Sequence, residues 1–266
     1  MNICFIGGGN MAEAIIAAVI TKKLCPPGEI TVADKDTARQ AYLAQTYGLK
    51  IASSNTAAVK GCQNIVLAVK PKNLSDVLIE LKGGLQPEQL VISIIAGVSM
   101  KRIGNGLIHA AIIRSMPNTP ASVGTGLTAW TAAPKVTESQ KHTAVGILSV
   151  MGKQIFFPEE KYLDVATAIS GSGPAYFFLF VEAIAEAGVK LGLAPDTALE
   201  MVLQTMLGAG ELMKQSGTAP AELRRMVTSK GGTTERALQK FDEAGFRSIV
   251  ESAMNAAYDR ARKMGS

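Results

Sequence analysis

The sequence has few of the residues that serve as metal ligands, disulfide partners or proton carriers. It contains three cysteines and two histidines among 266 residues, and no Cys-x-x-Cys pair. Cys4, Cys25 and Cys62 are therefore predicted to be reduced structural thiols in a reducing compartment. No Cys or His spacing matches a metal site, so we expect no metal. His109 and His142 are interpreted as solvated side chains rather than catalytic bases.

Clustered charge and long apolar runs are also missing. The formal net charge is +5, but the basic residues are scattered, with short pairs such as Lys22-Lys23 and Arg224-Arg225, and there is one tryptophan. This distribution argues against nucleic-acid binding and suits small anionic ligands. No uncharged apolar run reaches the roughly 18 residues of a membrane span, and the N-terminus does not resemble a signal peptide. We therefore expect a cytoplasmic protein that does not bind membranes.

The first part of the chain alternates short apolar runs with amphipathic stretches. The apolar runs predict strands at residues 2–7, 29–33, 64–69, 90–95 and 111–116, with later strands at 125–131 and 153–157. Helical patterns occupy residues 11–21, 38–47, 74–81 and 139–150. Strands separated by helices indicate βαβ units with right-handed crossovers. The predicted fold class is α/β, with an N-terminal doubly wound parallel sheet.

The chain changes character near Phe157-Pro158. From Glu159 onward no strand is predicted, and helices are expected at residues 176–191, 199–213 and 246–264. The segment 176–191 is apolar on almost every side, and such a helix has to be buried all round. We therefore predict that residues 159–266 form an all-helical domain that pairs with a second copy. The result would be a homodimer or a ring of dimers, the alternative being that these helices pack on their own first domain.

A glycine-rich motif follows the first strand directly. Residues 6–12 read IGGGNMA and contain G-x-G-x-x-A at Gly7, Gly9 and Ala12. Gly7 permits a tight strand-to-helix turn, Gly9 lets the backbone approach a pyrophosphate, and Ala12 lets the helix pack close to the strand. The phosphates would bind the free N–H groups of the helix N-terminus. Because the motif follows a strand and opens a helix, residues 1–158 are predicted to be an NAD(P)-binding Rossmann domain.

Two further segments are expected at the same edge of the sheet. The second strand ends near Asp34 and Lys35, where the adenosine ribose is recognised. Asp34 favours NAD, whereas Lys35 and Arg39 favour the extra phosphate of NADP, so we expect NADPH with NADH as an alternative. Lys70-Pro71 ends the strand that begins at Asn64 and is expected to contact the cofactor.

No acid–base pair is evident on the catalytic side. Lys190 lies near the end of a helix, where a lysine complements the helix dipole. Two segments stand out instead, the small residues 170–175 and the segment 223–238 around a glycine pair. The second places Gly231-Gly232 ahead of a helix, with Ser229 and Thr233 beside the pair. Free N–H groups there form a receptor for a carboxylate, although an ordinary capped helix would have the same pattern.

Six motifs in order along the whole chain resemble the pyrroline-5-carboxylate reductase family. They are IGGGNMA at 6–12, LAVKP at 67–71, IAGVS at 95–99, RSMPNTP at 114–120, SGSGPAY at 170–176 and SKGGTTERAL at 229–238. The resemblance implies an NAD(P)H-dependent oxidoreductase that reduces the C=N bond of pyrroline-5-carboxylate to L-proline, the last step of proline biosynthesis. It also implies a set of site residues. The cofactor would contact Gly7, Gly9, Asn10, Met11, Asp34, Lys35, Asn55, Ala68, Lys70 and Pro71, and the substrate would contact Ser229, Gly231, Gly232, Thr233 and Thr234.

The reaction explains why no acid–base pair is evident. A protonated imine is already electrophilic, so hydride transfer requires mainly closeness and orientation. Thr234 is the catalytic residue implied by the resemblance, because its hydroxyl would bond the ring nitrogen. Asp34-Lys35 departs from a more phosphate-friendly pair in many relatives, and Thr233 replaces a smaller residue of some. Because cofactor and substrate residues lie in different domains, we expect the site at their junction, with two subunits contributing as one option.

Two other functions remain open. One is a related two-domain reductase, either a different imine reductase or a hydroxyacid dehydrogenase with a helical second domain. Such dehydrogenases use a lysine soon after a glycine-rich turn, and the segment after Ser172-Gly173 contains none. The other is a nucleotide sensor without catalysis, against which the intact glycine pair argues.

Overall fold

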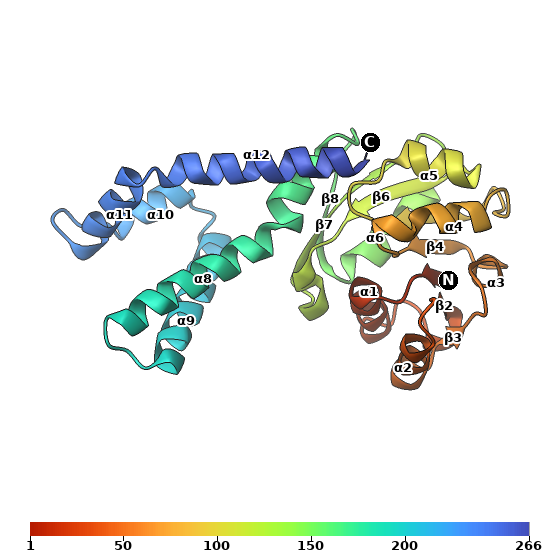
Figure 1. Cartoon of the computed structure of the whole chain (residues 1–266), viewed down its shortest axis with the longest axis horizontal. Helices are drawn as coiled ribbons and strands as arrows, with labels where there is room; N and C mark the ends of the chain where they lie inside the picture. Colours follow the sequence, from red (N-terminus) through yellow and green to blue (C-terminus); the bar gives the residue numbers. More distant parts are fainter. Residues whose placement is uncertain (266) are drawn as a thin grey trace. The chain divides into compact units, whose positions relative to one another are not determined.

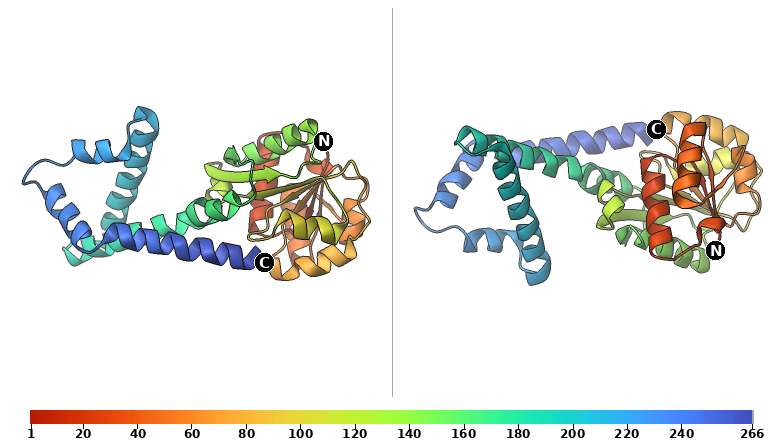
Figure 2. Two further views of the ribbon diagram at one scale, coloured as in Figure 1. Left: turned by 90° about the horizontal axis from the view of Figure 1, so that it is seen from above. Right: turned by 90° about the horizontal axis from the view of Figure 1, so that it is seen from below.

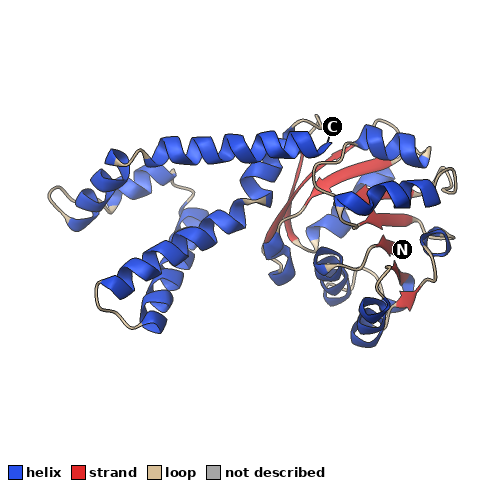
Figure 3. Cartoon of the chain, viewed as in Figure 1, coloured by secondary structure: helices blue, strands red, loops and turns tan. Residues whose placement is uncertain are grey.

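The computed structural model describes residues 1–265 and contains two compact units. The first, the sheet unit, comprises Met1–Ser172 together with the residues from Ala257 onward, and the second, the helical unit, comprises Gly173–Ala256. Strands are confined to the sheet unit in the described part of the chain (Figure 3). The two-domain α/β plus all-helical fold class predicted from the sequence is confirmed.

The sheet unit is built on one eight-stranded sheet in the order β3-β2-β1-β4-β5-β6-β7-β8 (Figure 1). Strands β1 to β6 are parallel, whereas β7 runs antiparallel to β6 and β8 runs parallel to β7. The strand order reverses beside β1, which is the point where doubly wound sheets bind ligands. The strands are β1 Ile3–Ile6, β2 Ile30–Ala33, β3 Lys50–Ile51, β4 Asn64–Leu67, β5 Leu90–Ser93, β6 Ile112–Met116, β7 Gly126–Ala132 and β8 Gly152–Phe156.

Helices cover both faces of this sheet (Figure 2). Ile3 and Phe5 of β1 face one layer, and Cys4 and Ile6 face the other, so all four residues of the strand are buried. Two-sided burial is why the parallel strands are continuous apolar runs. One layer contains α1 Asn10–Thr21, α2 Thr37–Tyr47 and α6 Glu138–Ser149; the other contains α3 Asn55–Val59, α4 Leu74–Glu80 and α5 Met100–Leu107.

Local sequence signals set most of these helix ends. The Asp36 side chain accepts hydrogen bonds from the N–H groups of Ala38 and Arg39 at the start of α2, and Gly48 ends that helix with φ of 70°. Thr137 and Gln140 form a capping box at the start of α6. The sequence missed α3, α5 and the two-residue β3. These elements are short, and the two glycines of α5 lower its helix propensity although its apolar residues follow the helical period.

The chain leaves the sheet through α7 Tyr162–Ala166, which continues into one turn of π-helix, η4 Thr167–Gly171. Leu163 and Ala166 pack against Ala129 of β7. Within the π-turn, the carbonyl of Ser170 accepts a hydrogen bond from Asn118 Nδ2 at 3.1 Å. The small-residue motif at 170–175 therefore spans the end of this π-turn and the start of the next helix, and its first residue is tied to the loop after β6.

Within the helical unit, small residues bring two long helices together. The helices are α8 Gly173–Lys190, α9 Pro195–Ser216, α10 Pro220–Met226, α11 Thr233–Glu243 and α12 Phe246–Gly265, the last turns of α12 belonging to the sheet unit. α8 and α9 pack as a hairpin, and a Cβ on Gly188 would lie 3.3 Å from the Cβ of Ala198. The ring of Phe241 contacts that of Phe180 in a tilted arrangement and that of Phe246 edge to face, with ring centroids 6.3 and 5.5 Å apart.

Most large apolar side chains of the helical unit are exposed in the single chain. Phe178 and Leu179 on α8 are 65% and 64% exposed, and Leu207 and Leu212 on α9 are exposed as well. By length and composition alone, the helical segment Tyr162–Lys190 could also cross a membrane, with a mean hydropathy of 1.3. This apolar surface requires a cover of some kind, because a folded chain rarely leaves so many large apolar side chains in water.

Candidate active site

The loop between β1 and α1 has the geometry of a phosphate-binding turn. Gly7 has φ of +99°, and a Cβ there would lie 2.8 Å from the carbonyl oxygen of Ala68. At Gly9, by contrast, an added Cβ would meet no atom within 4 Å. Gly9 is the N-cap of α1, and no side chain of the described residues caps that helix. The first-turn N–H groups of α1 are therefore available to an anion.

These N–H groups lie at a cavity of about 800 Å³, which we call the edge cavity. It lies at the carboxyl ends of β1, β2, β4 and β5, where the sequence predicted a ligand. The structure brings all of the predicted cofactor residues to its wall: Gly7, Gly9, Asn10, Met11, Asp34, Lys35, Asn55, Ala68, Lys70 and Pro71. The sequence missed Ile94, Ile95 and Ala96, which follow β5 and also line the cavity. Two signals were available, their position at the end of a parallel strand and the motif IAGVS at 95–99.

Asp34 supports the glycine loop. Its Oδ2 accepts the N–H of Gly8 at 2.6 Å, and its Oδ1 accepts the N–H of Asp36 at 2.9 Å. The two carboxylate oxygens are thus engaged by backbone donors, one from the glycine loop and one from the turn after β2. This arrangement fixes the loop to the end of β2 across 26 residues of sequence.

Two cations lie at the β2 side of the edge cavity. Lys35 is exposed and pairs with Asp76 at 3.1 Å. Arg39 donates from Nε to the carbonyl of Gly8 at 2.6 Å and forms an ion pair with Glu13. Burial acts to raise the pKa of Glu13, but hydrogen bonds from Arg39, Tyr47 and Tyr42 outweigh it and lower that pKa. Burial and the Glu13 carboxylate raise the pKa of Tyr47 to about 12.

Asn55 and Lys70 lie on other parts of the cavity wall. Asn55 begins α3, and its side chain donates to Glu80 Oε2 at 2.6 Å while its backbone N–H donates to Glu80 Oε1 at 3.0 Å. Lys70 precedes Pro71 in the turn that follows β4. With Lys35, Arg39 and Lys72, it gives the wall four cations beside the carboxylates of Asp34 and Asp36. Two of these cations are paired, Lys35 with Asp76 and Arg39 with Glu13. The case for an anionic ligand therefore rests mainly on the uncapped N-terminus of α1.

The predicted substrate residues form the loop between α10 and α11 of the helical unit. Gly231 has φ of +72°, and its N–H donates to Glu235 Oε2 at 2.7 Å. The N–H of Gly232 donates to the carbonyl of Ser229 at 3.0 Å, and a Cβ on Gly232 would lie 2.4 Å from Ser229 Oγ. Gly232 is the N-cap of α11, and no side chain of the described residues caps that helix. The N–H groups of Thr233 and Thr234 therefore open the helix without a capping side chain.

The two histidines and Lys190, which were considered as proton carriers, do not line the edge cavity. His109 Nε2 lies 2.7 Å from the carbonyl oxygen of Gln89. His142 is exposed on α6, and Lys190 is the exposed last residue of α8. In residues 1–265 there is no group of three or more His, Cys, Asp or Glu residues arranged to hold a metal ion.

Comparison with known proteins identifies the family of the chain. Over 265 residues it is 45% identical to a pyrroline-5-carboxylate reductase of Synechocystis sp., with 100% of this chain and 98% of the relative covered. The chain belongs to the pyrroline-5-carboxylate reductase family. The family model described as pyrroline-5-carboxylate reductase dimerisation matches residues 160–264, and the one described as NADP oxidoreductase, coenzyme F420-dependent, matches residues 2–97.

Two solved structures of the same family have the same fold along their length. The enzyme from Coxiella burnetii is 36% identical with a TM-score of 0.91, covering 100% of this chain and 98% of its own. The enzyme from Plasmodium falciparum, solved with NADP bound, is 30% identical with a TM-score of 0.90 and the same coverage. The activity predicted from the sequence is thereby confirmed: the chain is an NAD(P)H-dependent oxidoreductase that acts on the C=N bond of pyrroline-5-carboxylate.

Proposed function

We propose that the edge cavity holds NADPH and that the loop of residues 229–234 holds pyrroline-5-carboxylate, which is reduced to L-proline. One observation carries the cofactor assignment: the uncapped N-terminus of α1 and the open space at Gly9 meet on a cavity with a cationic wall. NADPH, when bound, supplies the hydride that reduces the C=N bond. The glycine loop suits NADPH because Gly9 has no side chain, and a Cβ at this position would fill the space that the pyrophosphate needs.

The glycine loop binds the pyrophosphate in this proposal. The backbone N–H groups of Asn10 and Met11 would donate to its oxygens, assisted by the positive end of the α1 dipole. Ala68, Lys70 and Pro71 flank the same cavity at the end of β4. Asn55 borders the adenosine side, where its amide is already oriented by Glu80.

The β2 side of the cavity favours NADPH over NADH. An aspartate that selects NAD accepts hydrogen bonds from the ribose hydroxyls, but both oxygens of Asp34 already accept backbone N–H groups. Lys35 is the proposed partner of the 2′-phosphate, and Arg39 could add only the guanidinium N–H groups that the Gly8 carbonyl and Glu13 do not use. The exposed pair between Lys35 and Asp76 is a weak competitor, because exposed ion pairs contribute about 0–1 kcal/mol.

The substrate loop anchors the carboxylate of the ring. The N–H groups of Thr233 and Thr234, together with the Ser229 hydroxyl, are the proposed donors. The Thr234 hydroxyl would bond the ring nitrogen and so fix the orientation of the C=N bond. Hydride transfer then needs no general base, because the protonated imine is electrophilic and orientation supplies most of the rate.

We further propose that residues 1–158 act as the cofactor domain and residues 159–266 as the substrate and dimerisation domain. This functional division differs from the compact units, because residues 159–172 and those from Ala257 onward belong to the sheet unit. The exposed apolar side chains of α8 and α9 support a homodimer, or a ring of dimers, as the working state. The cytoplasmic location predicted from the sequence stays a prediction. Leu179→Glu on α8 should lower the mass of the assembly in sedimentation, whereas Glu182→Gln on the same helix should leave it unchanged.

The first experiment measures NADPH oxidation by absorbance with and without pyrroline-5-carboxylate, with proline determined in the product. Substrate-dependent oxidation that forms equimolar proline supports the proposal, and a lower KM for NADPH than for NADH supports the cofactor preference. Cofactor binding without turnover would contradict the proposal and favour a sensor.

A further inference from the structure

The loop between β5 and α5, residues 94–99, forms one end of the edge cavity. Ile94, Ile95 and Ala96 line the cavity directly after β5. In a doubly wound sheet the dinucleotide spans the two sides of the glycine loop, and the end of β2 takes the adenosine. The nicotinamide therefore lies toward β4 and β5. This assignment rests on the proposed function.

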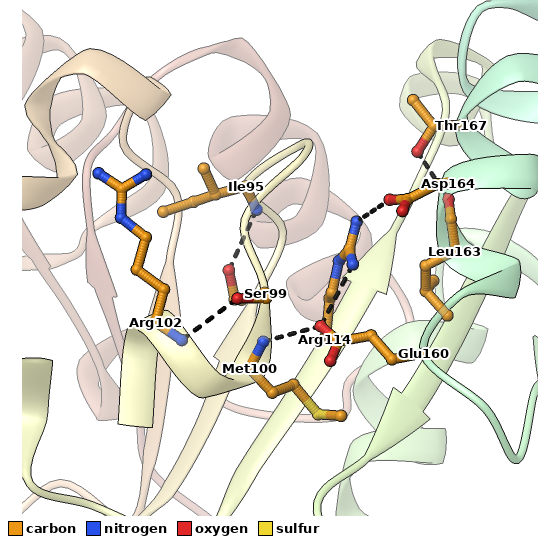
Figure 4. A network of polar contacts seen from close by, with 10 residues as sticks. Ile95, Ser99, Met100, Arg102, Arg114, Glu160, Leu163, Asp164 and Thr167 are labelled. Atoms are coloured by element: carbon orange, nitrogen blue, oxygen red, sulfur yellow. Dashed lines mark hydrogen bonds and ion pairs between the residues drawn. The ribbon is translucent and has the colours of Figure 1, made fainter. Parts of the chain in front are cut away.

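One side chain holds the far end of this loop. The N–H of Met100, the first residue of α5, donates to Glu160 Oε1 at 2.7 Å. The same oxygen accepts from Arg114 Nη1 at 3.2 Å, and Arg114 Nη2 donates to Asp164 Oδ1 at 2.6 Å. Figure 4 shows Arg114 pointing between the two carboxylates while Glu160 also faces Met100.

Arg114 makes this support rigid. Its side chain is 6% exposed, and it projects from β6, which pairs with β5 in the register Ser93↔Arg114. Charge-assisted hydrogen bonds are short and strong, and a buried arginine that lost its partners would be costly. Glu160 is thus tied to the sheet itself rather than to a mobile surface, although it lies 46 residues from Arg114 in sequence.

A second contact restrains the middle of the loop. Gly97 has φ of +71°, and a Cβ there would lie 2.6 Å from the Cβ of Met264 and 3.2 Å from the carbonyl oxygen of Ala261. Ala261 is buried in the last turns of α12. The loop is therefore restrained by backbone contact at Gly97 and by Glu160 at Met100.

We propose that Glu160 is a positioning residue for hydride transfer. It does not line the edge cavity. By accepting the N–H of Met100, it fixes the start of α5 and with it the residues that border the nicotinamide. Its loss should lower kcat and the share of cofactor affinity that comes from the nicotinamide, and should leave binding of the adenosine end unchanged.

A proline substitution at Met100 removes the relevant N–H with little change to the helix. Proline is well tolerated at the first position of a helix, and the preceding Ser99 already has the extended conformation, φ −74° and ψ 150°, that a following proline requires. Met100→Ala is the matched control, because it removes the side chain and retains the N–H. Glu160→Ala and Glu160→Gln form a second pair, since glutamine retains an acceptor oxygen for Met100.

The measurements are kcat, together with the dissociation constants of NADPH and of 2′-phospho-ADP-ribose, which lacks the nicotinamide. We expect Met100→Pro to lower kcat about tenfold, because the loss of a hydrogen bond to a charged group corresponds to about a tenfold change. The same variant should bind NADPH more weakly and should bind 2′-phospho-ADP-ribose as tightly as the unmodified chain. Met100→Ala should match the unmodified chain. Glu160→Ala should repeat the loss, and Glu160→Gln should recover most of it.

Several results would overturn the inference. One is an equal rise in the dissociation constants of NADPH and of 2′-phospho-ADP-ribose. Another is an unchanged kcat in Met100→Pro, and a third is a loss of kcat in Met100→Ala as large as that in Met100→Pro. If Met100→Pro does not fold, the Glu160 pair decides by the same measurements. A failure of the unmodified chain to oxidise NADPH with pyrroline-5-carboxylate would refute the proposed function, whereas the ratio of the two dissociation constants would still decide the role of Glu160.

Discussion

Two glycines of the β1–α1 loop should respond to the same substitution in opposite ways. At Gly7, alanine would have to adopt φ of +99°, and its Cβ would lie 2.8 Å from the backbone oxygen and 2.9 Å from the backbone carbon of Ala68. A strained backbone conformation of this kind costs about 1–3 kcal/mol, and the contact with immobile backbone adds to it. We expect Gly7→Ala to destabilise the fold by about 3 kcal/mol, which lowers Tm by about 6–12 °C.

Gly9→Ala should leave the fold intact and weaken the binding of the cofactor. Gly9 has φ −66° and ψ −178°, which alanine adopts without strain, and its Cβ would meet no protein atom within 4 Å. The stability of the ligand-free chain should therefore be unchanged or about 0.5 kcal/mol higher. The same methyl group would occupy the space of the pyrophosphate at a cost of about 1–3 kcal/mol, which raises the Kd of NADPH about 5- to 160-fold.

Thermal unfolding of the ligand-free chain and titration with NADPH separate the two effects. Gly7→Ala should have a lower Tm without ligand, and Gly9→Ala should have a normal Tm but a reduced stabilisation by NADPH. Gly9→Val should abolish the stabilisation. If Gly7→Ala unfolds at the temperature of the unmodified chain, or if Gly9→Ala binds NADPH normally, the assigned geometry of the loop is wrong.

Three further predictions concern single side chains. Lys35→Ala should raise the KM for NADPH about fivefold, which corresponds to about 1 kcal/mol, and should leave the KM for NADH unchanged. An equal rise in both KM values would show that Lys35 does not bind the 2′-phosphate. Thr234→Ala should lower kcat about tenfold and leave the affinity for NADPH unchanged, and Thr234→Ser should recover most of the rate. An equal loss of kcat and of NADPH affinity would contradict the contact between the Thr234 hydroxyl and the ring nitrogen. Because the folded-state pKa of Glu13 is lowered, its stabilising contribution is present above the ordinary glutamate pKa of about 4.3 and is lost as the pH falls through the lower folded value. Glu13→Gln should therefore flatten the decline of Tm with pH in that acid range, and an unchanged decline would argue against the contribution of Glu13.

The parallel strands β1, β2, β4 and β5 were predictable because each is a largely buried, mainly apolar run between turn residues. The predicted start of each strand except β3 falls within one residue of the observed one, and in β1, β4 and β5 burial on both faces keeps the run mainly apolar. The glycine loop was predictable for a related reason, because few residues other than glycine can adopt the backbone of Gly7. The sequence likewise predicted that α8 is too apolar for solvent exposure.

The interactions that distinguish the site were not readable from the sequence. Asp34 was expected at the ribose, but its role toward Gly8 depends on a contact across 26 residues. Arg114 gave no signal of its own, because its partners lie 46 and 50 residues away and no local pattern announces them. Side-chain contacts of this length follow from the packed sheet, so they become visible only once the topology is known.

The exposed apolar surface of α8 has a consequence for the life of the chain in a cell. Under the proposed pairing, the helical unit gains its cover only from a second chain, so its stability depends on chain concentration. A newly made chain would present Phe178 and Leu179 to proteases and chaperones until it meets another. Low expression should thus shorten the lifetime of each chain, and a variant impaired in pairing should be degraded faster even with its cofactor unit intact.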